Sequence, residues 1–378
     1  MIAAILKETT LGENRVAATP KTVKELIKSG LTVRIQSEAG KASFYSDQDY
    51  IDAGAEVISD ISSLYNNVNI VLKVAPATIA EIESFPNGTA YVSLMQTTRQ
   101  SQQVQKLTEK NITGFSMHLI PRTSLAQSMD ALSSQANIAG YKSVLMGATH
   151  LPVYMPLLMT AAGTIPPAKV LILGAGVAGL QAIATAKRLG AQVEAFDVRP
   201  EVKEQVESLG AKFVEVASDS DDGVGEGGYA KETSDDYKQR QQALIKAHIA
   251  KSNLVITTAL IPGRPAPLLI PTDMVNGMKP GSVIMDLAAE NGGNCELTQG
   301  DEIVNHNGVI IDGTINLPST MPAHASQLYA KNVSTFVTYM MKEGELNLDL
   351  EDEIISGAMF THEGKITHEP TRESMGNS

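Results

Sequence analysis

The 378-residue sequence predicts an α/β protein of two domains, each built on a mostly parallel sheet covered by helices. Short apolar runs alternate with amphipathic helical patterns along most of the chain. An all-apolar run at residues 170–173 leads directly into Gly174-Ala-Gly-Val-Ala-Gly179 and then into a helical pattern. A second apolar strand follows at residues 193–197 and ends in an acid, Asp197. Together these features place a parallel βαβ unit at the centre of the chain.

The three glycines of this unit have different expected roles. Gly174 permits a tight strand-to-helix turn, Gly176 lets the backbone approach a pyrophosphate, and Gly179 lets the helix pack closely on the strand. The helix predicted at residues 177–189 would present its N-terminus to the phosphates, where unpaired N–H groups and the macrodipole favour negative charge. The order strand, glycines, helix, strand and acid therefore predicts Rossmann-like domains and a dinucleotide site.

Asp197 indicates which dinucleotide is bound. A carboxylate at the end of the second strand can accept both ribose hydroxyls of an adenosine and repels a 2′-phosphate. NAD is therefore favoured over NADP. Arg199, two residues beyond the acid, keeps the alternative open, because an arginine there can serve NADP.

Composition excludes several classes of protein. The formal charge is −12 and the isoelectric point about 5.1, which argues against nucleic-acid binding and against direct attraction to anionic lipid. Cys295 is the only cysteine, so no disulfide can form within the chain and a reducing cytosol fits. Residues 143–168 lack Lys, Arg, Asp and Glu, but His150 and four prolines interrupt them. We expect a buried helix end and a connection there, and a soluble chain.

The N-terminal region predicts a second α/β domain without a glycine fingerprint. Strands are expected at residues 2–6, 32–36, 69–74, 90–95 and 112–117, with a helix that begins at Thr19-Pro20 and ends at Gly30. Residues 122–141 are rich in small and amide side chains and end in a helical pattern, so a helix is expected to cross from the first domain to the second.

The remaining elements complete both domains. Helices are expected at 201–209, 234–251 and 323–342, strands at 212–216, 254–260, 282–287 and 309–311, and a hairpin at 359–367 before frayed last residues. The 323–342 helix is expected to bury Leu328, Val333, Phe336 and Met340. Residues 218–233 are glycine-rich and acidic, which predicts a mobile loop. The predicted domains are 1–135 plus 321–378, and 136–320, with the dinucleotide in the cleft between them.

The sequence resembles the NAD(H)-binding component, domain I, of proton-translocating nicotinamide nucleotide transhydrogenases over essentially its whole length. The strongest matches are at residues 122–141, 160–167, 177–190, 227–232 and 257–263. Alanine dehydrogenases are related and share Lys7-Glu8, Arg15-Val16, Thr19-Pro20 and the region of Lys73.

The two families need different chemistry. An amino-acid dehydrogenase needs a general acid–base and cations for the substrate carboxylate. Its histidine corresponds here to Ser93, although Arg15, Lys73 and an acid, Glu290, remain. A transhydrogenase passes hydride directly between two nicotinamides and must above all hold the ring in position. An NAD-dependent amino-acid dehydrogenase, and an NAD-binding module without turnover, stay as alternatives.

The resemblance also implies site residues. Arg122, Gln127 and Asp130 would form a polar loop beside the nicotinamide, rigidified by an Arg–Asp pair, with Ser133 on the carboxamide. The remaining nucleotide contacts would be Val177, Asp197, Val198, Arg199, Gly228, Gln241 and Leu260, besides Gly174, Gly176 and Gly179 of the fingerprint. Tyr229 would lie at the tip of a loop that closes over the nucleotide, or else be an exposed aromatic of a disordered insertion. No metal is implied.

Partners follow from what this chain lacks. Hydride exchange needs NADP(H) on a second component, and proton movement needs a membrane-spanning subunit, so the resemblance implies both as separate subunits. It further implies a homodimer that is cytoplasmic and peripheral at the inner membrane through those subunits.

Overall fold

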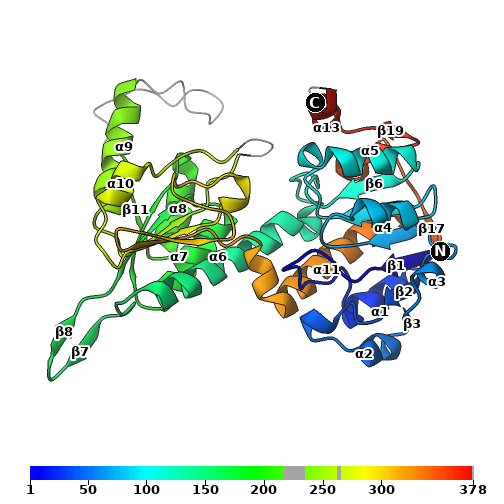
Figure 1. The fold of residues 1–378 in the computed structure, drawn as a ribbon, viewed down its shortest axis with the longest axis horizontal. Coiled ribbons are helices and arrows are strands. Elements are labelled where there is room, and N and C mark those ends of the chain that lie inside the picture. The colour runs from blue at the N-terminus through cyan, green and yellow to red at the C-terminus, as the bar shows by residue number, and fades with distance from the viewer. Residues whose placement is uncertain (217–234, 262–264, 377–378) are drawn as a thin grey trace. The chain divides into compact units, whose positions relative to one another are not determined.

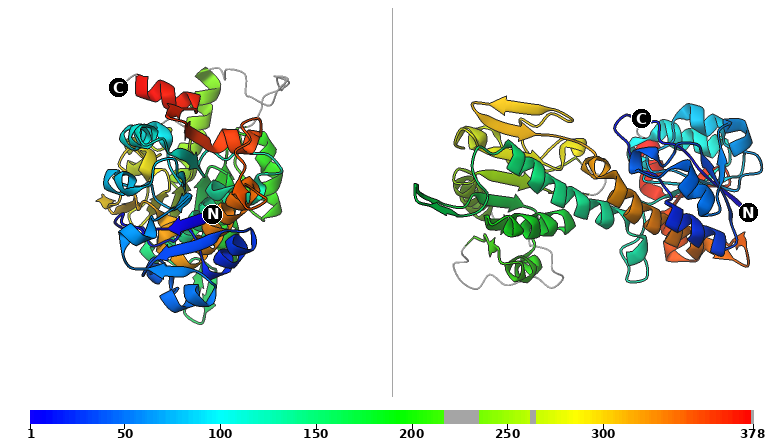
Figure 2. Two further views of the ribbon diagram at one scale, coloured as in Figure 1. Left: turned by 90° about the vertical axis from the view of Figure 1, so that its right-hand side faces the viewer. Right: turned by 90° about the horizontal axis from the view of Figure 1, so that it is seen from below.

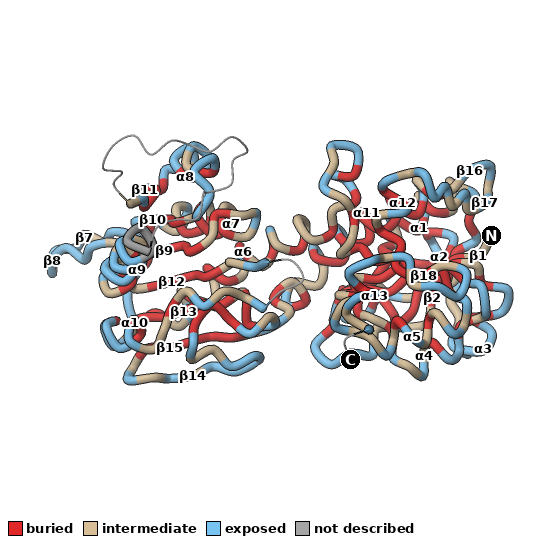
Figure 3. The backbone as a smooth tube through the Cα atoms, turned by 90° about the horizontal axis from the view of Figure 1, so that it is seen from above, coloured by how far each residue is buried: buried red, intermediate tan, exposed pale blue. Residues whose placement is uncertain are grey.

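The computed structural model describes residues 1–216, 235–261 and 265–376. They divide into two compact units, Met1–Gln135 with Pro318–Ser378 (unit 1) and Ala136–Leu317 (unit 2). Each unit has its own sheet and its own buried core (Figure 3). The predicted α/β class with two mostly parallel sheets is confirmed.

Unit 1 contains an eight-stranded sheet in the order β19-β18-β6-β5-β4-β1-β2-β3 (Figure 1). The first six strands of the chain pair in parallel, and the C-terminal β18 adds to β6 in the antiparallel sense. Their bounds are Ile2–Ile5 (β1), Thr32–Gln36 (β2), Glu56–Ile58 (β3), Ile70–Leu72 (β4), Ala90–Ser93 (β5), Thr113–Ser116 (β6), Met359–His362 (β18) and Lys365–Ile366 (β19). The order of the parallel strands changes direction between β1 and β4.

Helices cover both faces of this sheet because each strand is buried on two sides. One face packs against α1 (Pro20–Lys28), α2 (Asp47–Asp52), α11 (Pro322–Met340) and α12 (Glu353–Ala358). The other packs against α3 (Ile61–Leu64), α4 (Ile79–Ser84) and α5 (Ser101–Glu109) (Figure 1). The Thr19 side chain caps α1 and Pro20 is its first residue, as the sequence predicts.

Unit 2 contains a seven-stranded sheet in the order β11-β10-β9-β12-β13-β15-β14, parallel except for the edge strand β14. The strands are Lys169–Leu173 (β9), Gln192–Phe196 (β10), Lys212–Phe213 (β11), Leu254–Thr257 (β12), Val283–Asp286 (β13), Ile303–His306 (β14) and Val309–Asp312 (β15). One face packs against α6 (Ala131–His150), α7 (Val177–Arg188) and α8 (Lys203–Ser208), and the other against α9 (Asp235–Ile249) and α10 (Thr272–Asn276). The direction of strand order changes between β9 and β12.

The stretch at residues 143–168 differs from its prediction. After α6 ends at His150, the chain forms the hairpin β7 (Leu158–Thr160) and β8 (Gly163–Ile165), which extends away from the sheet of unit 2 (Figures 1 and 2). Most of its residues are exposed, so the prediction of a buried connection is wrong. Absence of charge therefore does not mean burial within the chain here, because no neighbouring element of unit 2 covers the hairpin in the described structure.

Two C-terminal expectations are also corrected. Leu328 is 40% exposed, because the buried stripe of α11 runs through Tyr329, Val333, Phe336 and Met340 and leaves Leu328 beside it. The last residues form α13 (Glu369–Gly376) and are not frayed up to Gly376, since Thr371 is buried and its hydroxyl bonds that of Thr97 at 2.6 Å.

Candidate functional site

The glycine-rich turn of unit 2 lies at the topological switch point of its sheet. Gly174 follows β9 and Thr258 follows β12, the two adjacent strands between which the strand order reverses. The Thr258 hydroxyl donates to the carbonyl of Gly174 at 3.0 Å and so joins the two strand ends. Ligands of open parallel sheets bind outside the carboxyl ends of the strands at this point.

The three fingerprint glycines answer different requirements. Gly174 has φ +105°, a conformation that side chains disfavour. A Cβ on Gly179 would lie 1.9 Å from the carbonyl oxygen of Gly174, so only glycine lets α7 approach β9 this closely. Gly176 has φ −76°, and a Cβ there would meet no described atom within 4 Å. The fold itself does not require glycine at 176, which leaves close approach of a ligand as the reason for it.

Asp197 faces this turn from the end of β10. One carboxylate oxygen accepts from the N–H of Ala175 at 2.7 Å, and the other from the N–H of Arg199 at 2.9 Å. The Arg199 guanidinium donates to both oxygens at 3.0 Å. Burial alone would raise the pKa of Asp197, but the hydrogen bonds from Arg199 and Ala175 outweigh it and lower the pKa. The group is therefore an anion and an acceptor at neutral pH.

The bidentate pair with Arg199 has a consequence for any ligand of Asp197. The carboxylate already accepts four hydrogen bonds, which fills its usual acceptor positions. Two ribose hydroxyls can therefore bind it only if the guanidinium turns away and releases two of them. Because half of the Arg199 side chain is exposed, this movement disturbs no core packing.

Apolar side chains are exposed around the same strand ends. Val177 is 41%, Leu260 51% and Val198 73% exposed, at the start of α7 and in the segments after β12 and β10. Exposed apolar groups beside convergent polar groups are typical of a ligand site. Gln241 is half-buried on α9. The remaining expected contacts, Gly228 and Tyr229, lie outside the described residues.

The polar loop expected beside the nicotinamide precedes α6 in unit 1. Arg122 and Gln127 are exposed, and no hydrogen bond of the Gln127 amide occurs within the described chain. Asp130 accepts from the N–H of Ser133 at 2.8 Å and from its hydroxyl at 2.6 Å. The Asp130 carboxylate thus caps the first turn of α6, and the expected ion pair between Asp130 and Arg122 does not occur among the described residues.

Sequence reasoning missed the residue that fixes this loop. Asn332 of α11 donates to the carbonyl of Ser128 at 2.8 Å and accepts from the hydroxyl of Ser134 at the same distance. In unit 2, buried Asn294 similarly holds the segment after β12 through the backbone N–H and carbonyl of Ala259. Neither asparagine belongs to a recognisable motif, because each acts across a long interval of sequence.

The switch point of unit 1 contains buried ion pairs. Lys73, after β4, lies 2.8 Å from Glu81 and 3.5 Å from Glu8, which follows β1. Arg15 pairs with Glu13 at 2.6 Å and donates to Gln135 at 2.9 Å. Glu8, Glu13 and Arg15 line a cavity of about 200 Å³. The two cations shared with alanine dehydrogenases are thus held by carboxylates of the chain itself.

The other two positions shared with alanine dehydrogenases are less suited to proton transfer. The Ser93 hydroxyl is buried and has no hydrogen-bond partner in the structure. Glu290 is exposed and accepts from the N–H of Asn316 at 2.6 Å. A buried hydroxyl of ordinary basicity does not replace a histidine as a proton carrier.

Glu8→Gln should change how stability depends on pH. Burial, followed by the opposing attraction of Lys73, raises the pKa of Glu8 from 4.5 to about 7. The folded state therefore binds the proton more tightly, and this contribution is full below pH 4.5 and is lost as pH rises through 7. Between pH 5 and 8 wild type should lose roughly 2–3 kcal/mol relative to the variant.

Urea unfolding at pH 5, 6, 7 and 8 measures this difference. Glu56→Gln, which changes a carboxylate with a half-exposed side chain, is the control and should follow wild type at every pH. Parallel profiles for wild type and Glu8→Gln would contradict a proton on Glu8 near neutrality.

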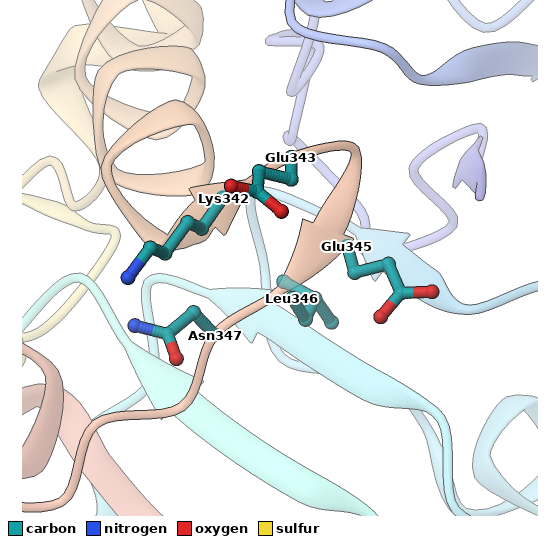
Figure 4. Close-up of a pocket in the computed structure, with 5 residues that line it drawn as sticks. All are labelled: Lys342, Glu343, Glu345, Leu346 and Asn347. Atoms are coloured by element: carbon teal, nitrogen blue, oxygen red, sulfur yellow. The ribbon is translucent and has the colours of Figure 1, made fainter.

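The largest concavity described elsewhere is not a convincing site. Lys342, Glu343, Glu345, Leu346 and Asn347 line it, and all five belong to the turn between β16 (Met341–Lys342) and β17 (Glu345–Leu346) or adjoin it (Figure 4). Across the described ranges, no helix is long and apolar enough to cross a bilayer, and no three His, Cys, Asp or Glu side chains cluster as metal ligands.

Comparison with known proteins assigns both units. The family model described as "Alanine dehydrogenase/PNT, N-terminal domain" matches residues 4–139, and its C-terminal counterpart matches residues 143–369. The chain is 45% identical over 376 residues to the first of the chains that make up the NAD(P) transhydrogenase alpha subunit of Rhodospirillum rubrum, covering 97% of this chain and 98% of that protein.

Solved structures agree. A transhydrogenase from Sinorhizobium meliloti superimposes with a TM-score of 0.88 at 44% identity, covering 97% of this chain and 100% of that one. An L-alanine dehydrogenase superimposes with a TM-score of 0.85 at 26% identity, covering 100% of this chain and 99% of that one.

Proposed function

The chain belongs to the alanine dehydrogenase/PNT family and, within it, to the NAD(P) transhydrogenase alpha subunits, and from this premise we propose that it binds NAD(H) and exchanges hydride directly with NADP(H) held by a partner component. The exchange is coupled to proton movement through a separate membrane-spanning subunit. The physiological site is cytoplasmic and peripheral at the inner membrane through those subunits.

The chemistry of the loop before α6 carries this proposal. Direct hydride transfer needs no proton carrier, but it needs groups that orient a nicotinamide within a few ångströms of its acceptor. The Gln127 amide is exposed and available for a ligand, and Ser133 retains acceptor capacity beside Asp130. Arg122 adds an exposed cation to the same loop.

In the proposed complex the adenosine of NADH lies on unit 2. Its ribose hydroxyls displace Arg199 from Asp197, its diphosphate approaches Gly176 at the N-terminus of α7, and Val177, Val198 and Leu260 cover its apolar surfaces. Gly228, Tyr229 and Gln241 complete the nucleotide contacts that the resemblance implies. NADH supplies the hydride when bound, and the chain's own task is to place the ring.

The test is a hydride-transfer assay with this protein, an NADP(H)-binding partner component and a reducible NAD analogue. Turnover that requires both proteins supports the proposal. An alanine arm separates the runner-up function, because the buried Ser93 hydroxyl cannot carry a proton as a histidine does. Robust NADH production from alanine, lost in Lys73→Ala, would favour an amino-acid dehydrogenase instead.

NADH should bind at least about thirtyfold more tightly than NADPH, or roughly 2 kcal/mol. The physical reason is the anionic, acceptor-only Asp197, which a 2′-phosphate would meet with like charge. Calorimetric titration of both nucleotides measures the ratio. Asp197→Asn is the matched variant and should narrow it, whereas equal affinities in wild type would refute the assignment of Asp197.

The protein should be a homodimer in solution, as its family resemblance implies. Support comes from the exposed hairpin β7–β8 and the segment before it, where Tyr154, Leu157, Met159 and Ile165 expose apolar surface. Light scattering at working concentration measures the mass. Replacing Leu157 and Met159 together by Ser should shift the population towards monomer, and a wild-type monomer would contradict the proposal.

A further inference from the structure

The segments that follow β5 and β6 in unit 1 are tied together at the carboxyl edge of the sheet. The Ser116 hydroxyl, at the end of β6, donates to the carbonyl of Met95 at 2.6 Å and accepts from its N–H at 3.3 Å. It also accepts from the N–H of His118 at 3.0 Å. His118 is therefore held beside the turn that leads from β5 into α5 (Figure 1).

Positive charge gathers at this edge. Arg99 lies in the turn after β5, and His118 and Arg122 follow β6. Burial lowers the pKa of His118, and the positive charges of Arg99 and Arg122 lower it further. His118 is accordingly neutral at physiological pH, and its ring forms no hydrogen bond within the described chain.

The N-terminus of α5 adds to the positive potential. This nine-residue helix begins at Ser101, directly after Arg99 and Gln100. No side chain caps its first N–H groups, and its first turn contains no acidic residue. Helix N-termini normally carry a capping oxygen or an acid because their unpaired N–H groups and dipole favour negative charge. A basic residue in front of an uncapped helix leaves that preference unmet.

Unsatisfied polar atoms mark the same place. The described chain has three buried side-chain atoms without a hydrogen-bond partner, Ser93 Oγ, Gln100 Oε1 and Thr123 Oγ1. Ser93 ends β5, Gln100 precedes α5 and Thr123 follows Arg122. Buried polar atoms in native proteins are almost always paired, with protein, water or ligand. Their concentration in the segments after β5 and β6 points to a missing partner there.

We propose that this edge of unit 1 is a binding site for a phosphate-class oxyanion, held by Arg99, Arg122 and the N-terminus of α5, with His118 taking up a proton when the anion enters. The hydroxyl of Thr123 is a further donor, and Gln100 can present its N–H₂ group after its side-chain amide flips. The anion neutralises the two arginines, so the charge that disfavours a protonated His118 disappears on binding.

Other charged groups near His118 do not already supply this anion. The only charges that shift its pKa are those of Arg99 and Arg122. The helix α13 packs on the turn containing Arg99, but its Glu369 pairs with Arg372 at 3.5 Å, and Glu373 is exposed. On α5, Lys106 pairs with Glu83 at 3.1 Å, and Glu109 lies at the opposite end of the helix.

The anion can be free phosphate or a phosphate group of a nucleotide. The site shares Arg122 with the proposed nicotinamide loop, whereas Arg99, His118 and α5 belong to no part of the proposed function. Loss of oxyanion binding in Arg99→Gln, with hydride transfer assayed separately, therefore distinguishes failure of this proposal from failure of the proposed function.

The test is proton NMR of the histidine ring signals in the full chain, titrated with sulfate between pH 5 and 9. Sulfate is a phosphate-like oxyanion that does not itself titrate in this range, and sodium chloride at matched ionic strength corrects for screening. Sulfate should raise the pKa of His118 by about one unit, and its affinity should increase about tenfold from pH 8 to pH 6.

Matched variants and ligands sharpen the result. His306 of unit 2, whose ring bonds Asn276 at 2.8 Å, is the internal control and should not respond to sulfate. Arg99→Gln should abolish the sulfate response of His118 without changing the melting temperature. Adenosine 2′,5′-bisphosphate acting at a tenfold lower concentration than inorganic phosphate would assign the site to a nucleotide, and equal potency to free phosphate. Equal shifts of His118 in sulfate and chloride would overturn the proposal.

Discussion

Gln127→Asn should slow hydride transfer about a hundredfold while changing NADH affinity by no more than about twofold. The exposed Gln127 amide forms no described hydrogen bond within the protein, so the substitution breaks no internal contact and acts only on what the amide positions. Shortening the side chain by one methylene withdraws the amide by about 1 Å or more, a displacement that is sufficient for such losses in near-attack geometry.

Stopped-flow hydride transfer at saturating NADH, with the NADP(H)-binding partner in excess, measures the rate. Tyr229→Ala is the comparison variant, since the resemblance gives Tyr229 a role in covering the nucleotide. It should weaken NADH binding modestly and leave the rate at saturation closer to wild type. A slower Tyr229→Ala, or a Gln127→Asn that loses only affinity, would show that the two roles are exchanged.

Gly179→Ala and Gly176→Ala should separate folding from binding within one motif. A Cβ added at Gly179 would lie 1.9 Å from a backbone oxygen, so α7 must move off β9, at an expected cost of about 3–5 kcal/mol in the free energy of unfolding. At position 176 the backbone angles suit alanine and no described atom is near. Gly176→Ala should leave stability within about 0.5 kcal/mol and weaken NADH binding at least tenfold.

Urea unfolding gives the two stabilities, and calorimetric titration of NADH gives the affinity. Gly140→Ala is a second steric control, because its Cβ would lie 2.1 Å from the carbonyl oxygen of Ala178 and should also destabilise unit 2. If Gly176→Ala binds NADH as tightly as wild type, the diphosphate does not approach this turn.

The sequence alone was sufficient where the controlling interactions are local. The alternation of strands and helices, the cap at Thr19-Pro20 and the hairpin turn at Glu363-Gly364 depend on neighbours a few residues apart, and all three are present as expected. The fingerprint Gly174 to Gly179 is local in the same sense, because one turn must satisfy strand, helix and phosphate together. Strand ends were less exact, since pairing across the sheet ends β12 at Thr257 rather than residue 260.

Tertiary structure alone decided the features that depend on distant partners. Asn332 reaches the polar loop across 204 residues, and Asn294 fixes the segment after β12 without any motif to announce it. Whether Lys73 is a substrate cation or a buried ion-pair partner depends on Glu8 and Glu81, which different elements bring to one strand end. The uncharged stretch around Met159 is exposed rather than buried, because hydropathy records the tendency to leave water but not which surface is present to receive the side chain.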